Sequence, residues 1–129
     1  MRTNRILGIA VALALLAACK ADSSREERPA RIVAPTATSR AELERVVSAA
    51  LGGVAVQLAD DALVHESRLI IEPRAYRDAQ NNRIMGRDPG TPTRFRLLKR
   101  GEQCILERLD TQLRWTLADT RCVADGTAE

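Results

Sequence analysis

The clearest hydrophobic pattern in the chain lies between residues 39 and 53. Ser39 followed by Glu42 is typical of a capping box at a helix start, and Gly52-Gly53 is typical of a helix end. The pattern predicts a helix over residues 40–51 with one apolar face, which packs on a core or, alternatively, binds a partner. The apolar positions recur at helical spacing: Leu43, Val46, Val47, Ala50 and Leu51.

Two short apolar runs follow this helix. Residues 54–58 (VAVQL) and 67–72 (SRLIIE) predict two strands, the second ended by Pro73, which has no amide to donate to a ladder. The connecting residues 59–66 fit either a helical turn or a wide loop that turns Leu63 inward together with its neighbour Val64.

Residues 74–93 are rich in turn formers. The stretch contains Asn81-Asn82, Gly86, Asp88-Pro89-Gly90 and Pro92, which predicts a long exposed loop. A loop of this length is often functional, and an irregular hairpin is the alternative.

Alternating apolar positions after residue 93 predict an antiparallel meander of three strands. A turn at Arg100-Gly101 would place Leu97 opposite Cys104, and Phe95 would then share their face. A second turn at Thr111-Gln112 would continue that face. It would place Leu106 opposite Leu117, and Arg108 beside the indole of Trp115.

These elements predict an α+β fold: one N-terminal amphipathic helix packed on a small antiparallel sheet, made of the meander and one or two further strands. The domain is expected to run from residue 39 to residue 124, and residues 125–129 form a tail. A core of this size is marginal for stability.

The N-terminus carries a targeting pattern. Arg2 and Arg5 precede a continuous apolar run over residues 6–16, which ends in Leu16-Ala17-Ala18-Cys19. This pattern resembles the signal peptide and lipobox of bacterial lipoproteins. The resemblance implies that residues 1–18 are removed and that Cys19 carries the lipid. An ordinary secretory signal is the alternative; the run is shorter than the roughly 20 residues of a membrane-spanning helix.

The residue after the lipidated cysteine bears on sorting. In lipoproteins that follow a sorting rule, aspartate there favours the inner membrane, so Lys20 predicts an outer-membrane protein that faces the periplasm. Residues 19–38 are expected to be the lipidated cysteine and a flexible tether, stiffened by Pro29 and Pro35, with an r.m.s. reach of about 25 Å.

Two further cysteines remain in this oxidising compartment. Cys104 and Cys122 form an even pair, so a disulfide between them is expected. The chain has a single histidine and no CxxC pair, so we expect no metal site and no cofactor.

The net charge argues against nucleic-acid binding. The whole chain has 20 basic and 17 acidic residues; removal of residues 1–18 takes away Arg2 and Arg5 and leaves 18 against 17, or +1. Tyr76, Phe95 and Trp115 are the only aromatic residues, too few for a base-stacking platform.

The charge is unevenly distributed. Residues 68–100 hold nine basic and three acidic residues, a local net charge of +6. Guanidinium groups suit phosphate and carboxylate, so an envelope protein or an anionic glycolipid is the expected partner, and a solvated loop is the alternative. The candidate surface consists of the arginines of the predicted loop: Arg74, Arg77, Arg83 and Arg87.

Catalysis has no support in the sequence. His65 lies near Asp60, Asp61 and Glu66, but no nucleophile elbow, metal-binding helix or phosphate loop accompanies them. We expect a protein that is not an enzyme.

The order of anchor, tether, helix and sheet resembles the small lipoproteins that accompany outer-membrane barrel assembly. Likeness of architecture transfers no residue and no function. The expected function is a non-enzymatic binding or accessory module anchored in the outer membrane. The alternative is an envelope-anchored inhibitor or stress-protection factor that acts on a protein target through residues 74–93.

Overall fold

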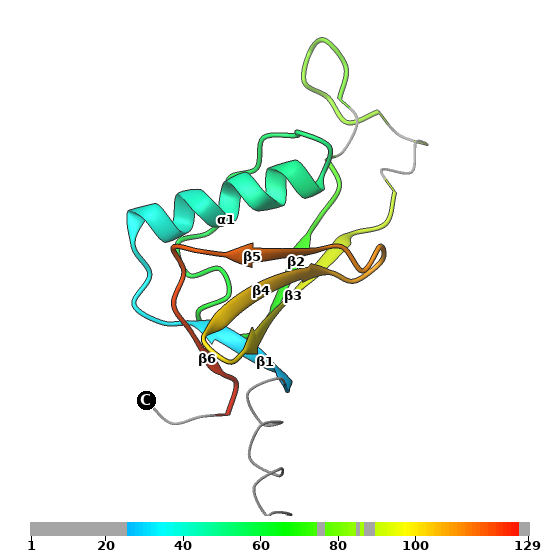
Figure 1. Ribbon diagram of the computed structural model, residues 1–129. Coiled ribbons are helices and arrows are strands. Elements are labelled where there is room, and N and C mark those ends of the chain that lie inside the picture. The colour runs from blue at the N-terminus through cyan, green and yellow to red at the C-terminus, as the bar shows by residue number, and fades with distance from the viewer. Residues whose placement is uncertain (1–25, 75–76, 85, 87–89, 127–129) are drawn as a thin grey trace, which may run out of the picture.

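The computed structural model describes residues 26–74, 77–84, 86 and 90–126. Within them one helix, α1 (Ala37–Ala50), lies across one face of a six-stranded antiparallel sheet (Figure 1), which confirms the predicted α+β class. Beside the meander lie three further strands. The strands are β1 (Glu27–Ile32), β2 (Arg68–Ile71), β3 (Thr93–Arg100), β4 (Gln103–Arg108), β5 (Arg114–Leu117) and β6 (Cys122–Ala124).

Strand β3 is the centre of the sheet. The order is β5-β4-β3-β1-β6, and β2 also pairs with β3. β2 pairs with residues 93–96 of β3 and β1 with residues 98–100, so the two strands follow one another along one side of β3 while β4 occupies the other. Among the described residues β2 has no second neighbour, so it is an edge strand there.

The core lies between α1 and the sheet. Alternate residues of β3 and β4 point toward the apolar face of the helix and are almost fully buried, as the predicted face requires. The core residues with the least exposure that come from the helix and these two strands are Leu43, Val47, Phe95, Leu97, Cys104 and Leu106.

The helix begins earlier than predicted, because a different capping box closes its start. Thr36 is the N-cap: its hydroxyl accepts from the Ser39 amide at 3.0 Å, and the Ser39 hydroxyl accepts from the Thr36 amide at 2.9 Å. The predicted pairing of Ser39 with Glu42 is wrong, since the Glu42 carboxylate is engaged elsewhere. Gly52, at φ +76°, lies just beyond the helix end as expected.

The predicted tether is wrong for residues 27–32, which form β1. Ala30 and Ile32 alternate into the core, and their strand lies between β3 and β6. This stretch forms a strand despite its polar composition, because two of its side chains are buried and its backbone pairs with two neighbouring strands. Among the described residues, regular structure therefore begins at residue 27 rather than residue 39.

Residues 54–58 are not a strand, contrary to the prediction. They run along α1, where the Val56 amide donates to the Ser48 hydroxyl (3.2 Å) and the Leu58 amide donates to Glu44 Oε1 (3.1 Å). The side chains of Ser48 and Glu44 thus accept the hydrogen bonds that a neighbouring strand would otherwise accept. In the turn that follows, Leu63 does point inward and is 2% exposed.

The meander has the predicted core face but a shifted register. Leu97 lies opposite Leu106 rather than Cys104, which lies opposite Leu117. Leu106 also lies opposite Trp115, so the predicted pairing of Arg108 with Trp115 across the two strands is wrong. Both shifts are of two residues. Because side chains alternate with a period of two, a two-residue shift keeps each side chain on its face.

The disulfide between Cys104 and Cys122 is confirmed. It joins β4 to β6 across a sequence separation of 18 residues, with the two Cα atoms 6.0 Å apart. Strand β6 has three residues, so this bond is a main attachment of the C-terminal segment to the sheet.

Candidate binding surface

The face of the sheet that points away from α1 is rich in arginine. The register places Arg68 opposite Arg96, and Glu107 opposite both Arg96 and Arg114. We call this surface the arginine face. Five guanidinium groups against the carboxylates of Glu27 and Glu107 leave a local charge of +3. Its five arginines are Arg68, Arg94, Arg96, Arg100 and Arg114.

One half of the arginine face is an ion-pair network. Glu107 is 6% exposed and accepts from Arg96 Nη2 at 2.9 Å and from Arg114 Nη2 at 3.2 Å. Arg114 Nη1 also reaches Glu27 at 2.6 Å, and Arg100 approaches the same carboxylate at 3.4 Å. The hydrogen bond from Arg96 lowers the pKa of Glu107. These three arginines are therefore committed to carboxylates of the protein itself.

The other half carries two arginines without such partners. Within the described part of the chain, the side chains of Arg68 and Arg94 make no ion pair or hydrogen bond. Both are exposed, and Ile70, which lies opposite Arg94, is 53% exposed. Like charges directly opposite one another destabilise a sheet; of the opposed pair Arg68 and Arg96, only Arg96 has a carboxylate partner, Glu107, among the described residues.

The loop arginines chosen from the sequence do not share this surface. Arg74 Nη2 lies 3.4 Å from the Ala55 carbonyl, and Arg77 Nη1 donates to the Asn81 carbonyl at 2.8 Å. Arg77 and Arg83 come together in an isolated β-bridge, and both are exposed. Their role as an anionic-partner surface stays a prediction; Arg87, the fourth member, lies outside the described residues.

The bridge is closed by a turn at residues 78–82, which includes the predicted turn formers Asn81-Asn82 and agrees locally with the alternative of an irregular hairpin. Asp78 Oδ1 accepts from the Gln80 amide at 2.9 Å and from the Asn82 amide at 2.8 Å. The hydrogen bond from the Asn82 amide lowers the pKa of Asp78. An aspartate that accepts amides two and four residues on is the signal of such a turn, and it holds Arg77 and Arg83 on its two arms.

A buried carboxylate was also missed. Glu42 is 5% exposed and accepts from the Ala118 amide (2.5 Å), the Asp119 amide (2.9 Å) and the Thr120 hydroxyl (2.9 Å). Three donors satisfy this side chain, and it ties α1 to the connection between β5 and β6. Glu42 therefore has a structural role, and we call its three hydrogen bonds to residues 118–120 the Glu42 clamp.

His65 is the residue around which the sequence analysis considered, and did not expect, a catalytic group. Its side chain is 77% exposed, and Nε2 lies 3.7 Å from Asp61 Oδ2 in a surface turn. In the residues that the structure describes, no three His, Cys, Asp or Glu side chains are grouped so as to hold a metal ion.

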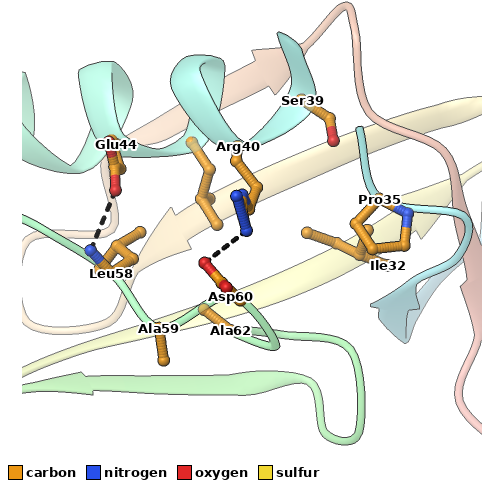
Figure 2. A pocket seen from close by; sticks show the side chains of 10 residues that line it. Ile32, Pro35, Ser39, Arg40, Glu44, Leu58, Ala59, Asp60 and Ala62 are labelled. Carbon is orange, nitrogen blue, oxygen red and sulfur yellow. Dashed lines mark hydrogen bonds and ion pairs between the residues drawn. The ribbon is translucent and has the colours of Figure 1, made fainter. Parts of the chain in front are cut away.

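A shallow hollow lies between α1 and the segment 58–62 (Figure 2), with an empty volume of about 300 Å³ that includes space open to solvent. Arg40 and Asp60 form an ion pair across it, and Glu44 accepts from the Leu58 amide. The charged side chains in this hollow are thus paired with groups of the protein, unlike Arg68 and Arg94.

Comparison with known proteins gives no relative from which to infer a role: no protein-family model, curated protein or solved structure matches the chain. The described part of the chain contains no helix long and apolar enough to cross a membrane. The lipobox-like stretch at residues 16–19 lies outside the described residues.

Proposed function

We propose that the protein is a lipoprotein anchored in the outer membrane through Cys19, facing the periplasm, and that it acts as a non-enzymatic binding module for an anionic envelope component. The lipobox pattern at residues 16–19 supports the anchor. The observation that supports the binding role is that Arg68 and Arg94 are exposed on the arginine face and have no ion-pair or hydrogen-bond partner among the described residues.

A protein partner suits this surface better than a glycolipid. Exposed Ile70 lies beside the two free guanidinium groups, so the surface offers apolar contact together with charge. Arginine binds carboxylates in a bidentate manner, and arginine is enriched in protein interfaces. The partner is expected to present acidic side chains next to an apolar one.

The test is affinity capture of partners from detergent-solubilised envelopes. The double variant R68E/R94E should lose the partner that the parent protein captures, because two guanidinium groups become carboxylates. A matched control is R45E/R121E, which changes the same charge at exposed positions on α1 and before β6. It should capture the partner as the parent does.

Salt provides an independent reading of the same experiment. Exposed charges are screened beyond about 10 Å at 0.1 M salt, so capture by the parent should fall as salt rises. Equal recovery by the parent and R68E/R94E at low and high salt would exclude the arginine face as the binding surface.

The turn at residues 77–83 favours a second candidate function. The turn lies at the end of the molecule opposite the start of β1 (Figure 1), and its two arms carry Arg77 and Arg83, an arrangement suited to the cleft of a target protein. In that case the protein is an envelope-anchored inhibitor or stress-protection factor. The variant R74Q/R77Q/R83Q/R87Q would then lose the target, whereas R68E/R94E would retain it.

A further inference from the structure

We infer that the free edge of β2 binds an acidic, extended segment of a partner protein as an added antiparallel strand. This inference rests on the proposed binding function and specifies its partner. It combines the unpaired backbone edge of β2 with the free guanidinium groups of Arg68 and Arg94 on the same strand pair.

The outer side of β2 has no backbone partner in the part of the chain that the structure describes. The strand pairs with β3 on one side, and among the described residues no backbone hydrogen bond reaches its other side. Residues 54–58, which the sequence predicted as a strand, bond instead to Ser48 and Glu44 of α1. A strand edge with unpaired amides and carbonyls is a template for another chain.

The register shows which backbone groups are available. The Leu97 amide donates to the Ser67 carbonyl at 2.8 Å, so Ser67 points its backbone groups toward β3. In an antiparallel pair these groups alternate from residue to residue, so Leu69 and Ile71 also point toward β3. The amides and carbonyls of Arg68 and Ile70 therefore lie on the open edge.

The side chains define the sequence that would fit. Arg68 and Ile70 lie on the arginine face, whereas Leu69 and Ile71 are half buried and pack on the core. Residues of an added strand that lie opposite Arg68 would share its face and so should be acidic. The alternate residues would lie beside Leu69 and Ile71 and should be apolar.

The composition of β2 also distinguishes it from a protected edge. Natural edge strands avoid unwanted pairing by carrying charges or proline. β2 has Arg68 at its start, but its other three residues are Leu69, Ile70 and Ile71, and Ile70 is 53% exposed. This composition admits an acidic segment, which neutralises the nearby arginines, and repels a basic one.

The probe is a fluorescein-labelled ten-residue peptide in which Glu and Val alternate, titrated into the detergent-solubilised full-length protein and followed by fluorescence anisotropy. Antiparallel addition puts the glutamates on the arginine face and points their amides toward β2. N-methylation of the glutamate amides should abolish binding. N-methylation of the valine amides, which point away, should leave the affinity within about twofold.

The variants test the side chains. R68E/R94E should weaken peptide binding at least about tenfold, and R45E/R121E should not. A second probe is a vesicle that contains phosphatidylglycerol. Binding to the vesicle but not to the peptide would overturn the inference in favour of a lipid surface.

Equal loss of binding for both N-methylated peptides would also overturn strand addition. Attraction by charge alone would not distinguish the glutamate amides from the valine amides. The proposed function fails separately: it falls if capture from envelopes is unchanged in R68E/R94E. It stands if capture is lost in that variant while both methylated peptides behave alike.

Discussion

At the scale of single residues, Glu42 and Glu107 show that similar carboxylates hold the fold together in different ways. Glu42 is buried against three uncharged donors from one connection, at Ala118, Asp119 and Thr120. Glu107 lies between two arginines on the opposite face of the sheet. Glu42 was predicted as a capping residue, because sequence spacing reveals neighbours along the chain and not donors 76 residues away.

Replacing Glu42 with alanine should lower the free energy of unfolding by about 2–4 kcal/mol, because two amides and a hydroxyl lose their acceptor. Urea unfolding followed by circular dichroism measures the change. The control R45A, at an exposed position on the same helix, should stay within about 0.5 kcal/mol of the parent. A Glu42 variant as stable as R45A would contradict the clamp.

Glu107 predicts a specific dependence of stability on pH. Its pKa in the folded protein lies below the ordinary glutamate value of about 4.3, so folding favours the ionised form. The stability it contributes is complete above that ordinary value and is lost as pH falls through the lower folded pKa. The difference in unfolding free energy between the parent and E107Q should therefore be constant above about pH 5 and shrink below pH 4. A difference that does not vary down to pH 3 would contradict this.

At the scale of elements, the sequence predicted which side of each strand is buried better than it predicted which residues pair across neighbouring strands. The apolar alternation placed Phe95, Leu97 and Leu106 on the core side, where they are buried. It could not fix which residues lie opposite, because a shift of two residues preserves every face. The observed register puts Gly101, at φ +58°, in the turn between β3 and β4.

Two other elements were predicted wrongly because their partners lie outside the local pattern. Residues 27–32 contain only Ala30 and Ile32 as core side chains, a pattern too short to distinguish from a tether. Residues 54–58 have the apolar content of a strand, but Ser48 and Glu44 of α1 hold their amides. For residues 27–32 the deciding partners are the distant strands β3 and β6, whereas for residues 54–58 they are side chains of the preceding helix, 8 and 14 residues away.

The disulfide predicts a measurable loss of stability on reduction. Opening the Cys104–Cys122 bond, whose residues are 18 apart, should cost about 3 kcal/mol by the loss of its constraint on the unfolded chain. Urea midpoints measured with and without reductant give the difference. The C104A/C122A variant should not respond to reductant; a parent midpoint equally insensitive would contradict the expectation.

At the scale of the whole molecule, the sequence located the basic segment but not the surface. Residues 68–100 carry the excess of positive charge, yet the arginines meet on one face only because β2, β3, β4 and β5 align in a particular register. Strand parity could have assigned Arg94 and Arg96 to the face away from the core. Parity also assigns Arg114, next to Trp115, to that face, but its ion pairs with Glu27 and Glu107 depend on a register that no local pattern encodes.

The position of β1 shortens the predicted tether. If Cys19 carries the lipid, β1 begins eight residues later, and at no more than about 3.6 Å per residue the two points are at most about 29 Å apart. The start of β1 and the turn between β3 and β4, which meet where Glu27 pairs with Arg100, would then lie toward the membrane. The β2 end would lie away from it, accessible to periplasmic proteins.

Membrane attachment is tested by C19S. This variant should leave the membrane fraction or accumulate as an unprocessed precursor, because Cys19 is the only cysteine that follows an apolar run and small residues. Fractionation and mass measurement of the mature N-terminus report both outcomes. A variant that fractionates and migrates as the parent does would contradict the lipoprotein assignment.

The central claim is that a partner lies against the arginine face in the cell, and photo-crosslinking in living cells tests it most directly. A photoreactive amino acid in place of Ile70 leaves the arginines intact and is exposed between the two free guanidinium groups; the same amino acid in place of Arg45 probes α1. We expect a covalent adduct with one envelope protein from position 70 and none from position 45. An adduct from position 45 without one from position 70 would contradict the account.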